Sequence, residues 1–317
     1  NCPQNRYSTS AAFLHAHVTW SLLEGLHGAK LWITRMGDFE PDSGTAYREV
    51  LCRHAEFYRE LARQHPRWIS ACCPLPPAAP FNFPYGAFAS QPSRNWGRDI
   101  FGRMGIPYHY GVADQDLPAL LTRTDVDRLD DESLRRVLSG RVLLDGGAAI
   151  ALTDRGLSSW TGGGARPWTQ PAVTFEVWST RCIHSAGAMF ADLRNRESGC
   201  EVLSTLFHAP YALSPKSDEV GPGVLLWTND AGGVVVTLAA CVTTPRDGFA
   251  HFNLLCEGRK SQFLSLLSRL DALPAYVPGD AEVMLNVGRL PDDGYLVAGL
   301  NIGLDALHCI PLEGSVV

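Results

Sequence analysis

An aromatic residue, a cation and a carboxylate stand close together near the start of this 317-residue chain. Trp32 belongs to the β-rich run AKLWIT, and Arg35 and Glu40 follow it in the polar segment RMGDFEPDSG. An aromatic face can pack on the C–H groups of a sugar ring, while a carboxylate accepts hydrogen bonds from the sugar hydroxyls. The residue types are therefore compatible with a sugar site. A core tryptophan beside a solvated acidic loop is the competing interpretation, and the residues alone leave both open.

A second segment has the form that covalent catalysis needs but not the reactive group. RVLLDGGAAIAL (residues 141–152) reads as a strand, a sharp turn and a helix. We call the turn at Asp145, Gly146 and Gly147 the elbow. A nucleophilic Cys or Ser at such a turn is typical of amidotransferase-type enzymes. Glycines and then Ala148 and Ala149 occupy these positions, so we predict a structural domain and disfavour an active amidotransferase.

The other reactive residues give no cofactor or metal signature, and we predict neither. The glycine-rich TGGGARP (residues 161–167) has no strand before it and no helix after it, so it does not match a phosphate-binding loop. His15 and His17 are two apart on a predicted helix and point to different faces. The nine cysteines form no CxxC pair, which argues against a zinc site and against a disulfide framework.

Composition excludes two broad classes of partner. The formal net charge is -6 and the 27 Lys and Arg residues are scattered, whereas nucleic-acid binders usually carry a basic stripe. No apolar run approaches the roughly 20 residues of a membrane span. The first residue is Asn1 and no signal segment follows it. We therefore expect a piece of a longer product, cut at both ends, and leave localisation unknown.

The elements expected in the first region, residues 1–75, are a helix, a strand and a helix. Apolar residues recur at helical spacing from Ser8, AKLWIT is strand-like, and a second amphipathic helix follows a cap at Asp42 or Ser43. One parallel strand needs neighbours on both edges. The sequence therefore predicts that this unit belongs to a larger sheet.

Three further regions follow. Residues 76–95 form a proline-rich linker. Residues 96–275 alternate short strands and helices, with a hairpin at Asn229–Gly233, and this predicts a doubly wound, flavodoxin-like α/β domain. In residues 276–317 two alternating strands meet at PDDG, which predicts the start of an all-β module, a partial β-sandwich.

Three segments resemble a known enzyme family. They are PQNRYSTSAAFLHAHVTWSLLEGLHGAKLWITRMGDFEPDSGTAYREVL, GRVLLDGGAAIALTDRGL and LPAYVPGDAEVMLNVGRLPDDGYLVAGLNIGLDAL. In this order they are similar to the bacterial family 42-like, beta-galactosidase-related glycoside hydrolases. The resemblance implies a (β/α)8 barrel, then a flavodoxin-like domain related to class I glutamine amidotransferases, then a β-sandwich. Residues 8–27, 28–34 and 43–63 would be the seventh helix, the eighth strand and the eighth helix of the barrel.

The resemblance also implies a function. It indicates retaining hydrolysis of β-linked sugars, with galactose as the best-known specificity, and trimerisation through the middle domain. The two catalytic glutamates would lie upstream of Asn1, so no catalytic residue is assigned in this chain. Trp32, Arg35 and Glu40 would line the sugar-binding mouth. The alternative is a non-catalytic oligomerisation or carbohydrate-binding protein with an amidotransferase-like fold that lacks the nucleophile.

Overall fold

The computed structural model describes residues 11–24, 41–74, 95–113, 116–185, 188–210, 216–242, 254–279 and 283–301. The chain divides into two compact units, Asn1–Trp68 with Gly288–Leu300, and Ile69–Val287 with Asn301–Val317. The predicted strand at residues 28–34 lies outside the described residues, as do Trp32, Arg35 and Glu40.

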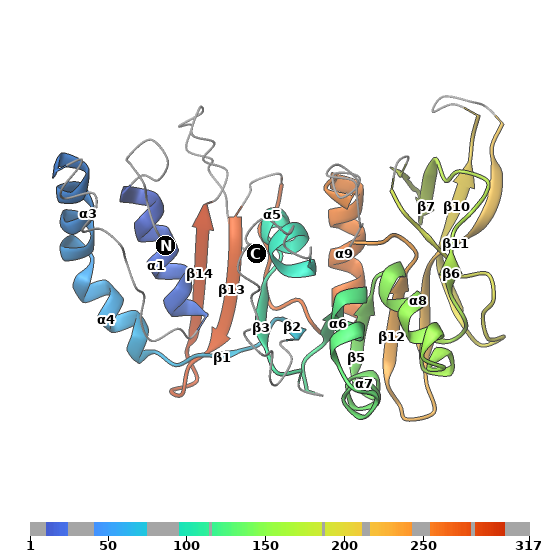
Figure 1. The fold of residues 1–317 in the computed structure, drawn as a ribbon, viewed down its shortest axis with the longest axis horizontal. Coiled ribbons are helices and arrows are strands. Elements are labelled where there is room, and N and C mark those ends of the chain that lie inside the picture. The colour runs from blue at the N-terminus through green and yellow to red at the C-terminus, as the bar shows by residue number, and fades with distance from the viewer. Residues whose placement is uncertain are drawn as a thin grey trace. The chain divides into compact units, whose positions relative to one another are not determined.

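The first unit contains the two predicted helices. The first is α1 (Ala11–Leu23), and the second is divided at His54 into α3 (Pro41–Arg53) and α4 (Ala55–Arg63) (Figure 1). Leu14 of α1 and Tyr47 of α3 are fully buried and belong to one apolar cluster, which also contains residues of both helices around them. The helical periodicity of the sequence therefore identified this packing face correctly.

A three-stranded sheet has the order β1-β13-β14, with β1 Arg67–Trp68, β13 Val283–Arg289 and β14 Tyr295–Asn301. The end of β13 pairs with β1 through Arg67 opposite Arg289 and Trp68 opposite Gly288. The predicted turn at PDDG joins β13 to β14, and the Leu290 N–H donates to the Gly294 carbonyl at 2.8 Å. The hairpin is confirmed, whereas its pairing with a strand more than 200 positions earlier in the chain was not predicted.

Among the described residues of the second unit, nine strands form one mixed sheet of order β3-β2-β4-β5-β12-β11-β10-β7-β8 (Figure 1). The strands from β3 to β12 are parallel, and those from β12 to β8 are antiparallel. The α/β class is thus confirmed, with a sheet that is parallel in one half and antiparallel in the other. The bounds are β2 Ala71–Pro74, β3 Tyr108–Gly111, β4 Ala119–Leu121, β5 Arg141–Leu144, β7 Phe175–Trp178, β8 Arg181–His184, β10 Glu201–His208, β11 Asp218–Thr228 and β12 Val234–Leu238.

Short helices connect many of these strands, as the sequence predicted for this α/β unit. The helices are η2 Gly97–Phe101, α5 Gly102–Met104, α6 Arg123–Arg128, α7 Asp131–Leu138, α8 Gly146–Asp154, η3 Ser158–Thr161 and α9 Glu257–Arg269. A two-stranded ribbon pairs β6 Arg166–Pro167 with β9 Ala191–Asp192. Asp130 caps α7, with its carboxylate accepting from the Ser133 N–H at 2.7 Å. The predicted hairpin between β11 and β12 is also confirmed.

Side chains of the parallel strands alternate between two apolar cores, as the two-residue period of a strand requires. Leu143 and Val236 pack with the aromatic cluster of Trp96, Phe101 and Phe263 on one side. Their chain neighbours, among them Val142, pack with α6 and α7 on the other side. Both faces of the parallel half are therefore covered, which explains why its strands are almost continuously apolar.

A buried ion pair joins α9 to the antiparallel half. Arg259 and Glu176 are both fully buried, and Arg259 Nη1 lies 2.5 Å from Glu176 Oε2. The other carboxylate oxygen, Oε1, accepts from Gln262 Nε2 at 2.6 Å and from Ser204 Oγ at 2.5 Å. Arg259 and Gln262 are three apart and therefore share one face of α9. A polar face of α9 is thus buried, whereas a pattern of polar residues would predict a face exposed to solvent.

We predict that Glu176→Ala lowers the free energy of unfolding by about 3–5 kcal/mol, because it leaves the Arg259 charge buried without its partner. Urea unfolding of the full chain measures this. The matched control is Arg269→Ala on the same helix, because the Arg269–Glu201 pair is 3.7 Å apart and about half exposed on both sides. Its loss should cost less than about 1 kcal/mol. Equal effects of the two variants would contradict the prediction.

Candidate functional site

The elbow predicted from the sequence is present at the end of β5. Asp145 is fully buried and caps α8, with one carboxylate oxygen accepting from the Ala148 N–H at 2.7 Å. Its other oxygen accepts from the Val242 N–H, also at 2.7 Å, in the segment that follows β12. Since β5 and β12 are parallel neighbours, their carboxyl ends lie at the same edge of the sheet. Asp145 therefore fixes the elbow to the end of the neighbouring strand.

No nucleophile is present at the elbow, and the backbone there is tightly enclosed. A Cβ atom added to Gly146 would lie 2.1 Å from the Ala239 carbonyl oxygen, so only glycine fits. Ala148 and Ala149 are buried in the cores. A Cβ at Gly147 would lie 3.2 Å from the Cβ of Arg123, which is tight but not prohibitive. Gly147 is the elbow glycine that lines a cavity.

Cys241 is a nearby thiol, one of the nine cysteines that form no motif in the sequence. It follows β12 and lines the same cavity as Gly147. Burial, reinforced by the Asp145 carboxylate, raises the pKa of the Cys241 thiol far above its usual range, although Arg123 and the Gly147 N–H oppose the shift. The thiol therefore stays protonated at neutral pH and is a poor nucleophile. A cysteine directly after a buried strand was the only signal that could have drawn attention to it.

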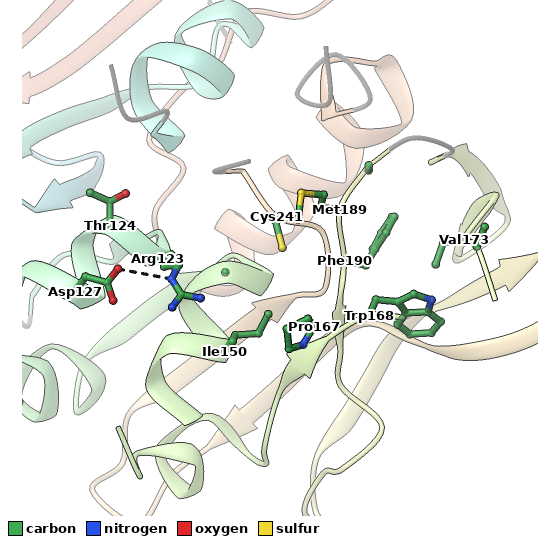
Figure 2. Close-up of a pocket in the computed structure, with 13 residues that line it drawn as sticks. Arg123, Thr124, Asp127, Ile150, Pro167, Trp168, Val173, Met189, Phe190 and Cys241 are labelled. Carbon is green, nitrogen blue, oxygen red and sulfur yellow. Dashed lines mark ion pairs between the residues drawn. The ribbon is translucent and has the colours of Figure 1, made fainter. Parts of the chain in front are cut away.

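A cavity of about 650 Å³ opens beside the elbow (Figure 2). We call it the elbow cavity. Its apolar wall consists of Ile150, Pro167, Trp168, Val173, Met189 and Phe190. Its polar end contains Arg123, Thr124 and Asp127 from α6, with Arg123 Nε 3.6 Å from Asp127 Oδ2. Figure 2 shows the polar end and the aromatic residues of the wall on opposite sides.

The polar end is positioned by the cap of α6. Thr122 and Asp125 form a capping box, in which the Thr122 N–H donates to Asp125 Oδ2 at 2.8 Å. The cap starts the helix at Arg123, and Asp127 follows one turn later on the same face. The sequence TRTD carries this signal.

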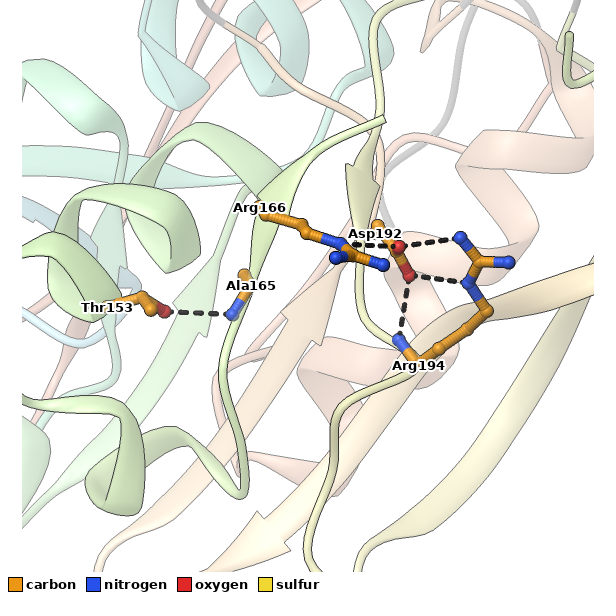
Figure 3. Close-up of polar contacts among 5 residues, drawn as sticks. All are labelled: Thr153, Ala165, Arg166, Asp192 and Arg194. Atoms are coloured by element: carbon orange, nitrogen blue, oxygen red, sulfur yellow. Dashed lines mark hydrogen bonds and ion pairs between the residues drawn. The ribbon is translucent and has the colours of Figure 1, made fainter. Parts of the chain in front are cut away.

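A charged network holds the segment of residues 165–166, which precedes Pro167 and Trp168 of the apolar wall (Figure 3). Asp192 on β9 is buried, and its Oδ2 lies 3.0 Å from Arg166 Nε and 2.7 Å from Arg194 Nη2. Arg194 also donates from Nε to Asp192 Oδ1 at 2.8 Å. Directly before Arg166, the Ala165 N–H donates to Thr153 Oγ1 at 2.8 Å. These contacts fix residues 165–166, which lead directly into Pro167 and Trp168.

Trp168 itself is held on three sides. Its backbone N–H donates to the Phe190 carbonyl at 3.0 Å, and its indole N–H donates to the Pro171 carbonyl at 2.6 Å. The Arg194 guanidinium carbon lies over the ring, 5.2 Å from its centroid. The indole is therefore a fixed part of the cavity wall.

The histidines do not form a metal site in the part of the chain described. There, no three His, Cys, Asp or Glu side chains come together as metal ligands. His15 and His17 have separate environments, as predicted: His15 stacks on His54 with ring centroids 3.9 Å apart and bonds Tyr58 OH at 2.8 Å, while His17 contacts Phe13. Burial, followed by the charge of His54, lowers the pKa of His15. Within the described residues, no helix is long and apolar enough to cross a membrane.

The geometry supports binding rather than covalent chemistry. The elbow lacks a nucleophile, the pKa of the Cys241 thiol is raised by burial, and the adjacent cavity combines an aromatic wall with the Arg123–Asp127 ion pair. The predicted sugar-site residues, Trp32, Arg35 and Glu40, lie outside the described residues, so the structure neither joins them to this cavity nor separates them from it.

No protein-family model and no curated protein matches this chain by sequence. Among solved structures, the fold is similar to that of alpha-L-fucosidase isoenzyme 2 from Paenibacillus thiaminolyticus, with a TM-score of 0.54 and 12% sequence identity. The similarity covers 92% of this chain and 47% of the fucosidase chain, so this chain spans about half of that protein's length. At this identity the likeness concerns the fold alone, and the fold is related to that of a glycoside hydrolase.

We predict that Cys241 reacts with iodoacetamide at least about ten times more slowly than the exposed Cys52 and Cys256 in the native protein, because burial keeps it as a thiol. Peptide mass spectrometry after timed alkylation measures the three rates. A Cys241→Ser variant identifies the peptide and serves as the control. Labelling of Cys241 as fast as Cys52 would show that the thiol is accessible and ionised.

A second prediction concerns acid stability. Hydrogen bonds from Arg194 hold the pKa of Asp192 well below its usual range. A lowered folded-state pKa stabilises the protein above the unfolded pKa of about 4, and that contribution is lost as the pH falls through the lower folded value. Asp192→Asn should therefore cost about 1–3 kcal/mol at neutral pH, with the difference from the parent shrinking below about pH 4.

Urea unfolding at several pH values between neutral and about 2 tests this. The exposed Asp230→Asn serves as the control and should show no such pH-dependent difference. A cost for Asp192→Asn that stays constant over the whole pH range would contradict the assigned role of its charge.

Proposed function

We propose that this chain is part of a glycoside hydrolase and that its second unit is a non-catalytic, flavodoxin-like domain related to class I glutamine amidotransferases. The observation that carries the proposal is the fold likeness to the fucosidase over 92% of the chain. The order of the sequence segments that resemble family 42-like glycoside hydrolases supports it independently.

The elbow supports the non-catalytic role of this domain. The strand, turn and helix of an amidotransferase-type nucleophile elbow are present, yet glycine and alanine occupy the reactive positions. The one thiol at the cavity is buried and held in its protonated form. The elbow positions 146–149 therefore offer no side chain on which an acyl-enzyme intermediate could form.

Hydrolysis itself is assigned to carboxylates outside this chain. In a retaining glycosidase, two carboxyl groups about 5–5.5 Å apart act as nucleophile and as acid/base. In this proposal they are glutamates of a (β/α)8 barrel whose last strand and helix are residues 28–34 and 43–63. Residues 1–75 would complete that barrel, residues 76–95 would link it to the domain at 96–275, and residues 276–317 would begin a β-sandwich. Trp32, Arg35 and Glu40 would line the mouth of the barrel.

The substrate class follows as a sugar with a glycosidic bond at its anomeric carbon. The sequence resemblance favours a β-linked sugar such as a β-galactoside, and trimerisation through the second unit belongs to the same resemblance. The structurally similar protein is named an alpha-L-fucosidase, so α-L-fucosides are the competing substrate class.

A carbohydrate-binding or oligomerisation protein is the second candidate. The elbow cavity favours it, because an aromatic wall opposite a paired carboxylate and guanidinium can hold a sugar without any hydrolytic group.

We predict that the protein encoded by the complete reading frame releases nitrophenol from one member of a panel of nitrophenyl glycosides that includes the β-D-galactoside and the α-L-fucoside. Replacing the glutamate at the end of the seventh barrel strand by glutamine should abolish release, because it removes the nucleophile. Trp32→Ala should raise KM about tenfold by removing the platform for the sugar. The exposed Phe13→Ala is the matched control and should leave KM unchanged.

Release from no glycoside, with the upstream glutamates missing from the reading frame, would refute the hydrolase and leave the binding protein. Release that survives the glutamate replacement would refute the proposed mechanism.

A further inference from the structure

We infer that the elbow cavity is a binding site for a neutral sugar ring. The inference deepens the proposed function and rests on it for the choice of sugars. The cavity volume of about 650 Å³ falls within the range of small-molecule sites. All the residues used below are described in the structure and belong to the second unit.

The apolar side of the cavity matches the less polar face of a pyranose. Trp168 and Phe190 lie next to each other, linked by the backbone hydrogen bond between them. Sugar rings present C–H groups on one face and pack them against aromatic surfaces. Because Trp168 is already fixed by Pro171 and Arg194, binding does not have to order its side chain.

The polar side of the cavity matches sugar hydroxyls. A hydroxyl both donates and accepts, so it can donate to the Asp127 carboxylate and accept from the Arg123 guanidinium. Thr124 adds a further hydroxyl to the same end. The Arg123 and Asp127 side chains are about half exposed, so both groups can be reached by a ligand from solvent.

The charge balance of this end disfavours ions. Arg123 lies 3.6 Å from Asp127, which lines the cavity, and 3.9 Å from Asp154, which lies outside its lining, so two carboxylates share one guanidinium. An anion would meet these carboxylates, and a cation would meet the guanidinium. A wholly apolar ligand would cover the pair without hydrogen-bonding to it, which is costly. A neutral ligand with several hydroxyls avoids all three penalties.

Isothermal titration of the full chain with methyl β-D-galactoside and methyl α-L-fucoside tests the inference. At least one of the two should bind, with millimolar or better affinity. Ala188→Trp should weaken binding at least about tenfold because Ala188 lines the cavity and a large side chain there fills it. Asp127→Asn should also weaken binding because the amide accepts fewer hydrogen bonds from hydroxyls.

The matched control is Glu132→Gln, an exposed carboxylate on α7 outside the cavity lining, which should bind as the parent does. Thermal unfolding of each variant shows that it is folded. Asp127 lies on the surface of α6, so its variant stays informative even where Ala188→Trp does not fold. Absence of binding by both sugars, or binding that neither variant weakens, would overturn the inference.

This outcome is distinguishable from a failure of the proposed function. A complete protein that hydrolyses a glycoside while the cavity binds neither sugar would retain the function and refute the site. A complete protein with no hydrolytic activity, together with binding that both variants weaken, would retain the site and refute the hydrolase.

Discussion

The architecture around the elbow depends on one buried carboxylate, that of Asp145. Its two oxygens accept from the Ala148 N–H and the Val242 N–H, each at 2.7 Å, and so connect the start of α8 to the chain beyond β12. Without it, two buried N–H groups would lose their partners, each at a cost of about 1–3 kcal/mol. The two segments border the elbow cavity through Gly147 and Cys241. Asp145 and the parallel pairing of β5 with β12 therefore hold together the two segments that form this side of the cavity.

In the antiparallel half of the sheet, a buried ion pair connects a helix to a strand. Among the described residues, no crossover helix links the antiparallel strands, and α9 supplies a buried ion pair with β7. A Cβ on Gly223 of β11 would lie 2.9 Å from Glu176 Cδ, so a glycine leaves room for the carboxylate. Glu176 and Arg259 thus act as a specific joint between helix and sheet. Apolar contacts, which have no direction, would define that position less closely.

The sequence predicted the elements whose local signals are strong. The sequence marks the turn at Asp145 and the hairpin at Asn229–Gly233, because caps and turns are fixed by neighbouring residues. It did not predict β2, whose ACCP is buried on both faces and has no alternation, nor the pairing of β1 with β13. The candidate site shows the same limit. The elbow was visible as one continuous segment, whereas the cavity beside it combines Arg123, Trp168 and Cys241 from distant positions, and no short-range pattern joins them.

The elbow shows how a sharp turn between a strand and a helix can form without a nucleophile. Gly146 is required by the Ala239 carbonyl oxygen, whether or not a nucleophile follows. Ala148 is buried in the core, so a hydroxyl or thiol there would not reach the cavity. Only position 147 borders the cavity, and a Cβ there would lie 3.4 Å from both carboxylate oxygens of Asp145. A cysteine at that position would meet a negative charge, which disfavours the thiolate that catalysis needs. The buried carboxylate that builds the turn therefore opposes nucleophilic chemistry at the turn, while it leaves the neighbouring cavity free to bind a ligand.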